Sequence, residues 1–414
     1  MDKRAGHRQR AAKAHEERRA RVQEALATQG LSALLCAHGA NVLMLSGYAS
    51  VIGAAVAIAT ADGKLVLVVP EDELKMARDS WADDIFFFQA ATLNAMHTGR
   101  AALRSALAKA LDACLPEARH GGARIGMEFA RAHLPASYAS QLVYGAMLDQ
   151  LIEEIAPACM PVPADTLLAQ LRMRPTAAEL ERIRASCAIA AAAFHEGAAR
   201  LVAGASEREA AQHFSEAYVR AVDRHADVTR ADAFFYCMSG PNAAHAHAAF
   251  QQSTARRLLR GETILIHCNS HADGYWTDLS RTYVLGQPDA RLARMQEAIM
   301  AARRAALAAI RPGVAAGAID RAARAVLDEA GFGADFKHPT GHGVGFIAID
   351  HEEPPQLHPH SHEPLLPGMV FNVEPGIYIG GLGGMRDCNM VAVTEDGHEL
   401  LSPFQLEHHA WSIE

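Results

Sequence analysis

The sequence lacks any long hydrophobic segment. Its longest unbroken apolar run, counting glycine, is the nine residues from Val51 to Ala59, whereas a helix that crosses a bilayer needs about 20. The hydrophobic part of a secretory signal is also missing near its start, because residues 1–22 hold eight Lys or Arg and three Asp or Glu. We therefore expect a cytoplasmic protein that is neither secreted nor bound to a membrane.

Cysteine is scarce, and positive charge is not in excess. The seven cysteines show no CxxC spacing and are odd in number, which favours reduced thiols over a disulfide framework. The formal net charge of −8 argues against a nucleic-acid partner, and the basic start is typical of a solvated helix. The 414 residues, half of them apolar, are enough for two domains with their own cores.

Histidine is the residue type in excess. The chain has 22 histidines, and ten of them lie between His245 and His362. Histidine is the commonest metal ligand and a proton carrier near neutral pH. The clustering therefore favours a functional site in the C-terminal half, although it does not locate one.

Alternating strand and helix signals predict an N-terminal α/β domain over residues 1–160. Four prolines between positions 157 and 175 then predict a linker over residues 161–175, which leads into a second domain at 176–414. The predicted elements of the first domain are a basic helix to about Gln29, strands at Ala33–Cys36, Val51–Ala59 and Lys64–Val69, and a helix at Ala101–Leu115.

The second domain shows a weak internal repeat, in which a long helix is followed by a glycine turn and a shorter helix. Thr176-Ala-Ala-Glu179 and Ser206-Glu-Arg-Glu209 are capping-box sequences that open the two helices of the first copy. A duplicated domain would hold a site between its halves, whereas alanine-rich composition alone could produce the same pattern. The second copy has helices at Ala290–Ile310 and Gly317–Ala330, and the predicted strands are Thr263–Cys268, Arg281–Leu285, Val370–Glu374 and Met390–Thr394.

Four segments with polar, chemically active residues lie where strands of the second domain begin or end. They are Ser239-Gly-Pro-Asn-Ala-Ala-His-Ala-His247, the stretch from His267 to Asp278-Leu-Ser-Arg-Thr, Thr340-Gly-His342-Gly-Val-Gly with His351-Glu-Glu-Pro after it, and Val373-Glu374-Pro-Gly with Gly-Met-Arg386-Asp-Cys388-Asn.

These segments, in this order, resemble the creatinase, prolidase and aminopeptidase P family from about Ala20 to the C-terminus. Asn41-Val-Leu-Met-Leu-Ser-Gly47 is similar to the family's N-terminal motif Asn-Val-x-Tyr-Leu-(Ser/Thr)-Gly. The resemblance implies an α+β protein, in which a creatinase-like α/β domain precedes a duplicated pita-bread domain like that of methionine aminopeptidases. It also implies a homodimer.

The family's peptidases bind two divalent metal ions through five side chains, and the resemblance assigns those positions here. Asp278, His342 and Glu374 match the family's residues, whereas His267 replaces the first Asp and Cys388 replaces the last Glu. Asp387 or Asn389 would take the place of Cys388 if the strand register slips. His and Cys bind Zn²⁺ and other borderline metals. We therefore expect an altered site with one or two Zn or Mn ions, with a metal-free active site and an inactive cavity as alternatives.

The resemblance also implies roles for residues outside the ligand set. His247 stands where the family places a substrate-contacting histidine, which transfers protons in the metal-independent creatinase. His351 resembles the histidine that steadies the tetrahedral intermediate, although it lies nine rather than seven residues after His342. Arg386 fits an arginine near the last ligand, where a guanidinium can orient a carboxylate. Two candidates for substrate contacts are His245, which would share a face with His247 in a regular strand, and Tyr275, which could equally pack.

The favoured function is hydrolysis of an amide or peptide C–N bond, as in Xaa-Pro aminopeptidases and dipeptidases. A water activated by metal or by His247 would attack a small peptide or amide, with His351 and Arg386 stabilising the charge that develops on oxygen. One alternative is a metal-independent amidohydrolase of the creatinase or ectoine hydrolase kind, acting on a small zwitterion. Another is a non-catalytic, peptide-binding pita-bread protein.

Overall fold

The computed structural model describes residues 3–51, 55–90, 96, 98–129, 145–248, 252–347, 352–402, 404 and 412–413. The chain divides into two compact units, the first comprising Met1–Arg172 and Thr176–Ala178, the second Met173–Pro175 and Glu179–Glu414. Both units combine sheets and helices, which confirms the predicted α+β class. Among the helices of the described ranges, none is long and apolar enough to cross a membrane.

The first unit is built on a six-stranded sheet with the strand order β4-β3-β2-β1-β5-β6. The predicted elements are present, although β2 begins at Val56 and residues 52–54 lie outside the described part of the chain. Its strands are β1 (Ala33–Cys36), β2 (Val56–Thr60), β3 (Leu65–Pro70), β4 (Asp84–Phe88), β5 (Arg124–Met127) and β6 (Met160–Pro163). Its helices are α1 (Lys3–Gln29), α2 (Gly39–Ser46), α3 (Leu74–Ala77), α4 (Gly99–Cys114), α5 (Gly145–Ile155) and α6 (Asp165–Met173).

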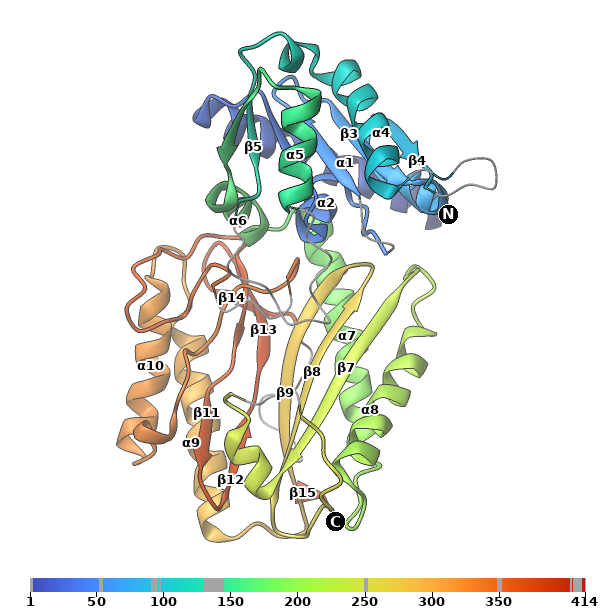
Figure 1. Cartoon of the computed structure of the whole chain (residues 1–414). Coiled ribbons are helices and arrows are strands. Elements are labelled where there is room, and N and C mark those ends of the chain that lie inside the picture. The colour runs from blue at the N-terminus through green and yellow to red at the C-terminus, as the bar shows by residue number, and fades with distance from the viewer. Residues whose placement is uncertain are drawn as a thin grey trace. The chain divides into compact units, whose positions relative to one another are not determined.

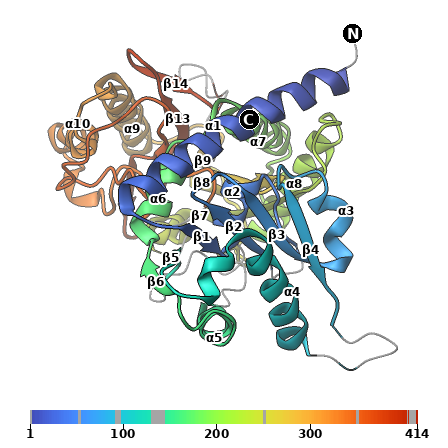
Figure 2. The same ribbon diagram turned by 90° about the horizontal axis from the view of Figure 1, so that it is seen from above.

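The core of the first unit follows from the spacing of apolar residues in α4. Leu103, Leu107 and Leu111 recur every four residues and are buried against the sheet, as period-3.6 spacing requires. The helix begins after Thr98, whose hydroxyl accepts a hydrogen bond from the Ala101 amide at 3.2 Å. Figure 2 shows α4 and α5 on one face of the sheet and α2 on the other.

The segment expected as a linker, residues 161–175, carries regular structure. β6 pairs in parallel with β5, and α6 follows it, so the first unit extends to Arg172. Proline is tolerated in β6 because this strand lies at the edge of the sheet, where Pro161 and Pro163 remove no essential ladder hydrogen bond. The prolines that indicated a loop therefore mark an edge strand.

The second unit contains a four-stranded sheet (β15-β9-β8-β7), a three-stranded sheet (β10-β13-β14) and the pair β11-β12. Its strands are β7 (Ala231–Ser239), β8 (Thr263–Ala272), β9 (Tyr275–Leu285), β10 (Val370–Val373), β11 (Gly376–Ile379), β12 (Gly383–Arg386), β13 (Asn389–Val393), β14 (His398–Leu400) and β15 (Ser412–Ile413). Its helices are α7 (Ala177–Ala198), α8 (Glu207–Val222), α9 (Ala290–Ala309) and α10 (Ala316–Glu329).

The four helices form the two long-then-short pairs that the sequence repeat predicts. Figure 1 shows α7 and α8 beside β7, and α9 and α10 on the opposite side of the unit, with α9 next to β11 and β12. α8 begins with a complete capping box, because Ser206 accepts from the Glu209 amide and Glu209 accepts from the Ser206 amide. The strands of this unit, and the turns and loops next to them, carry the polar segments picked out from the sequence.

Candidate active site

The hairpin of β8 and β9 supplies the first part of the site. Its antiparallel register pairs His267 with Ser280 and Asn269 with Asp278. Because side chains alternate along a strand, these four polar side chains lie on one face of the sheet. The opposite face carries apolar residues, among them Phe235 and Tyr283, which pack against Phe214 of α8. The alternation of polar and apolar residues in these two strands therefore directs the polar set to a common surface.

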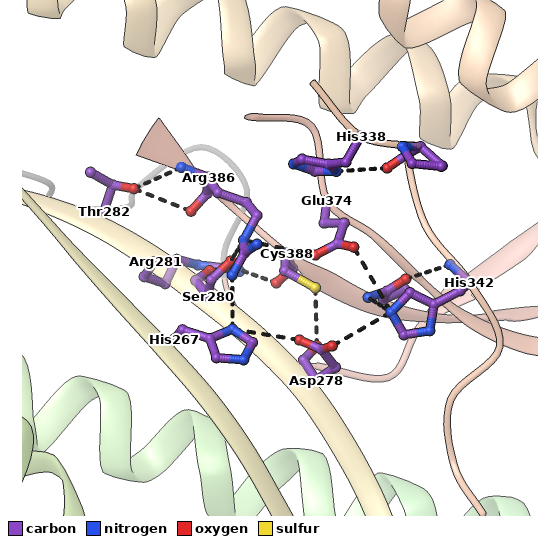
Figure 3. A network of polar contacts seen from close by, with 12 residues as sticks. His267, Asp278, Ser280, Arg281, Thr282, His338, His342, Glu374, Arg386 and Cys388 are labelled. Atoms are coloured by element: carbon purple, nitrogen blue, oxygen red, sulfur yellow. Dashed lines mark hydrogen bonds and ion pairs between the residues drawn. The ribbon is translucent and has the colours of Figure 1, made fainter. Parts of the chain in front are cut away.

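Two further ligand candidates come from the second half of the duplication. Glu374 directly follows β10, and Cys388 lies between β12 and β13, joined to β9 by a bridge between Cys388 and Ser280. The side chains of Asp278, Glu374 and Cys388 offer ligand atoms that all lie within 4.8 Å of one another, and all three are buried. Figure 3 shows them converging from three separate segments.

His342 completes this group. Its Nε2 lies 3.6 Å from Oδ2 of Asp278 and 3.9 Å from Oε1 of Glu374. The ring is oriented by its Nδ1, which donates to the carbonyl of Gly343 at 3.0 Å and so leaves Nε2 to face the carboxylates. The flanking glycines are needed for close approach, since a Cβ at Gly341 would lie 2.0 Å from the carbonyl oxygen of Asn372.

His267 lies beside this group but is engaged elsewhere. Its Nδ1 accepts a hydrogen bond from Nη2 of Arg386 at 2.9 Å, and its Nε2 contacts Oδ1 of Asn269 at 3.0 Å. Burial, together with the charge of Arg386, lowers the pKa of His267 to about 4 and keeps the imidazole neutral. The nearest oxygen of Asp278 is 3.8 Å from Nδ1. Both ring nitrogens therefore have partners other than a metal.

Arg386 brings a positive charge into the site. It is buried, and its Nε donates to Oγ of Ser280 at 3.1 Å and lies 3.8 Å from Oε2 of Glu374. Burial would lower the pKa of Arg386, but Tyr378 and the nearby carboxylates outweigh it and raise the pKa, so the guanidinium stays charged. The sequence placed this arginine near the last ligand, and the structure brings it into contact with His267 as well.

The pKa values of the two carboxylates are shifted in opposite directions. Burial would raise the pKa of Asp278, but the hydrogen bond from His342 and the nearby positive charges outweigh it and lower the pKa. Burial and the charge of Asp278 raise the pKa of Glu374, against the effect of Arg386. Burial also raises the pKa of the Cys388 thiol, whose Sγ lies 3.0 Å from the carbonyl oxygen of Asp278.

Asp278, Glu374 and Cys388 could hold a divalent cation. Oδ1 of Asp278 is buried and has no hydrogen-bond partner in the part of the chain that the structure describes, as expected of an atom that awaits a ligand. Two carboxylates and one thiol, with an imidazole beside the carboxylates, are donors of the kind that Zn²⁺ takes in proteins. The charge of Asp278 contributes to the raised pKa of Glu374, so an added positive charge would stabilise both carboxylates in their ionised form.

Two candidate substrate contacts do not join this group. Tyr275 is an odd number of residues from Asp278 along β9, so it faces the other side of the sheet and packs on Phe346 at 5.6 Å between ring centroids. His245 is exposed, because residues 240–245 form a 3-10 helix rather than the strand that would align it with His247. The positive φ of 46° at Gly240 starts this turn.

The catalytic candidates have different positions. His247 lies just after the 3-10 helix, with its ring centroid 5.2 Å from that of Tyr378, and burial lowers its pKa. His351 lies outside the described residues. The sequence interpretation overlooked Tyr378 and His338, whose Oη and Nε2 are 2.9 Å apart. Their spacing was a usable signal, since each lies four residues from a ligand candidate, Glu374 or His342.

Comparison with known families now identifies the chain. Residues 181–395 match the model of metallopeptidase family M24, and residues 18–174 match the creatinase/prolidase N-terminal domain. The chain belongs to metallopeptidase family M24. This confirms the family and the two-domain architecture indicated by the sequence motifs.

Curated relatives and solved structures agree with this assignment. A probable dipeptidase PepE of Mycobacterium tuberculosis is 39% identical over 243 residues, which are 58% of this chain and 60% of that protein, less than two thirds of its length. An Xaa-Pro dipeptidase of Pyrococcus furiosus is 31% identical over 59% of this chain and 67% of its own. The crystal structure of dipeptidase PepE from Mycobacterium ulcerans matches with a TM-score of 0.72 at 27% identity, over 97% of this chain and 98% of that one.

Proposed function

We propose that this chain hydrolyses the C–N bond of a small peptide at a single divalent metal ion. The convergence of Asp278, Glu374 and Cys388 within 4.8 Å, with His342 against both carboxylates, carries the proposal. The relatives named as dipeptidases and as an Xaa-Pro dipeptidase support a peptide substrate, with proline after the scissile bond as the first class to test.

Asp278, His342, Glu374 and Cys388 would hold the ion. A sulfur and a nitrogen donor beside two carboxylates favour Zn²⁺ over Mn²⁺, which prefers oxygen ligands. Such a cation, when bound, lowers the pKa of a water and polarises the scissile carbonyl. This proposed ligand set differs from the altered metal site expected from the sequence in leaving out His267 and in holding a single ion.

A second ion is disfavoured by the surroundings of His267. Both ring nitrogens of His267 have partners, and one of these partners is the charged guanidinium of Arg386. A metal ion bound at His267 and the guanidinium of Arg386 would repel each other strongly in a buried site. Arg386 therefore supplies, near Glu374, positive charge that a second metal would otherwise provide.

The chain's own residues account for proton movement and charge stabilisation. Nδ1 of His247 is buried, so Nε2 is the ring atom left to exchange protons. Nε2 would accept a proton from the attacking water and pass it to the leaving nitrogen. The lowered pKa of His247 keeps it neutral and able to accept. Arg386 would stabilise negative charge on the carbonyl oxygen. The roles of His351 and of a homodimer remain predictions from the family resemblance.

A second candidate is a metal-independent amidohydrolase acting on a small zwitterion. The contact between Arg386 and Glu374 favours it, since the guanidinium already compensates one buried carboxylate without an ion. In this reaction His247 would transfer the proton, and the Cys388 thiol would keep its contact with the Asp278 carbonyl.

Elemental mass spectrometry of the untagged protein tests the proposal. We expect about one equivalent of Zn per chain, lost in Cys388→Ala and in Asp278→Ala. Cys268→Ala is the matched control, because Cys268 is a buried thiol of the same hairpin on the opposite face of the sheet. Cleavage of Xaa-Pro dipeptides should follow the metal content. A metal-free wild-type protein, even after incubation with Zn²⁺ or Mn²⁺, would contradict the proposal and support the second candidate.

A further inference from the structure

Two buried carboxylates outside the metal group hold the two segments that carry the site histidines His247 and His342. Glu207, the first residue of α8, and Asp320, in α10, are both fully buried. α8 and α10 are the shorter helices of the two repeat copies, so the carboxylates occupy comparable places in the duplicated unit.

Glu207 closes the loop that carries His247. Its Oε1 accepts from the amide and the hydroxyl of Ser239, at 2.7 and 2.8 Å. Its Oε2 accepts from the amide and the hydroxyl of Thr254, at 2.9 and 2.7 Å. Both oxygens also accept from the amide group of Asn242 at 3.0 Å. One carboxylate thus fixes both ends of the segment on which His247 stands.

Asp320 holds the segment that carries His342. Its Oδ1 accepts from the amide and the hydroxyl of Thr340, both at 2.9 Å. The carbonyl of Thr340 in turn accepts from the amide of Glu374 at 2.8 Å. Arg324 pairs with both oxygens of Asp320 and donates to the carbonyl of His338 at 3.1 Å. Thr340 therefore links Asp320 directly to one proposed ligand, Glu374, and lies two residues before another, His342.

The two halves use the same arrangement. In each, a buried carboxylate of the second helix receives the backbone N–H and the hydroxyl of one Ser or Thr in the loop that leads to a site histidine. Hydrogen bonds to a buried carboxylate are among the strongest that neutral donors make, and they fix loop geometry firmly.

We propose that Glu207 and Asp320 are positioning residues, one for His247 and the other for His342 and Glu374. The inference rests on the proposed function for its catalytic consequence, but the anchoring itself does not. A purely structural role would lower stability without a preference for either histidine. A positioning role predicts separate effects: Asp320 acts on metal binding, and Glu207 acts on turnover.

Hydrogen exchange of the full-length protein tests the anchoring directly. The isosteric variants Glu207→Gln and Asp320→Asn replace an accepting oxygen by a donor of similar size. We expect exchange to become about tenfold faster in residues 239–248 for Glu207→Gln and in residues 338–343 for Asp320→Asn. Exchange that accelerates equally in both segments for both variants would contradict separate anchoring.

Metal titration and steady-state kinetics test the consequence. Asp320→Asn should weaken Zn²⁺ binding about tenfold to a hundredfold, as for other residues that orient metal ligands. Glu207→Gln should leave Zn²⁺ affinity unchanged and lower kcat about tenfold or more. Thr340→Ser keeps the hydroxyl and should retain wild-type affinity, whereas Thr340→Val should weaken it.

Asp273→Asn is the matched control. Asp273 also accepts from two loop amides, those of Thr229 and Arg230, and pairs with Arg182, but that loop carries none of the candidate site residues. If Asp320→Asn and Glu207→Gln change affinity and kcat no more than Asp273→Asn does, the positioning role is wrong. If the wild-type protein binds no metal and cleaves no peptide, the proposed function fails; histidine NMR signals then decide positioning, since each variant should shift only its own histidine.

Discussion

Nη2 of Arg386 lies 2.9 Å from Nδ1 of His267, so a guanidinium contacts the residue that the sequence resemblance assigns to the family's first aspartate position. Cys388, which the resemblance assigns to the last glutamate position, lies two residues after this arginine in the chain. Arg386 thus contacts His267 and lies 3.8 Å from Glu374, whereas Cys388 offers its sulfur within 4.8 Å of Glu374 and Asp278.

Restoring the two carboxylates should restore a second metal ion. In His267→Asp/Cys388→Glu, the new oxygens neutralise Arg386 and supply ligands for two cations, so metal content should rise from about one to about two equivalents per chain. Elemental mass spectrometry after incubation with Mn²⁺ measures it. His271→Asp/Cys388→Glu, with the first change four residues away on the same face, should show no such gain. A double variant that stays at one equivalent would show that Arg386 alone excludes the second ion.

Gly341→Ala should displace His342. The added Cβ would lie 2.0 Å from the Asn372 carbonyl oxygen, and such overpacking costs about 1–3 kcal/mol of unfolding free energy. Metal content should fall with it. Gly380→Ala, where nothing lies within 4 Å of the new Cβ, is the control. Chemical denaturation and metal analysis measure the two effects. Equal stability and equal metal content in Gly341→Ala and Gly380→Ala would contradict this prediction.

Tyr378→Phe should distinguish the contribution of the Tyr378 ring from that of its hydroxyl. The ring beside His247 is kept, while Nε2 of His338 loses its partner at 2.9 Å. An unpaired polar group in a mostly buried position costs about 1 kcal/mol or more. We expect lower stability and lower kcat at unchanged metal content. If chemical denaturation and steady-state kinetics give the same stability and kcat for this variant as for the wild-type protein, the hydroxyl contact is dispensable.

Acid should destabilise the protein in part through His271. Burial is the main cause that lowers the pKa of His271 below 6.5, and its ring packs 4.6 Å from that of Trp276. Below about pH 6.5 the unfolded chain therefore binds a proton that the folded chain does not, and stability falls as pH falls. His271→Gln should show a shallower fall of unfolding free energy between pH 7 and 5. Parallel profiles for both proteins would rule this contribution out.

Much of the fold was predictable because its signals are local. The capping sequence at Ser206 and the apolar periods of α4 depend on neighbours in the chain, so the predicted helices agree with the structure to within a few residues. The prolines of β6 misled because their meaning depends on whether a strand lies at an edge, which is a property of the whole sheet.

The site was predictable as a set of segments but not as a network. The position of Tyr275 could have been predicted, since strand alternation from Asp278 sends it to the other face. The contact of Arg386 with His267 could not, because it joins strands 119 residues apart in the chain. The same holds for Asp320 and Thr340, whose hydrogen bonds form only after α10 has packed.

The proposed metal group takes one ligand, Asp278, from the first half of the duplicated unit and three from the second, ending with Cys388. During synthesis, a nascent chain would have to emerge as far as Cys388 before all four side chains could surround an ion. Metal capture would then be a late event of folding, and the ion would stabilise only a unit whose two halves had already joined.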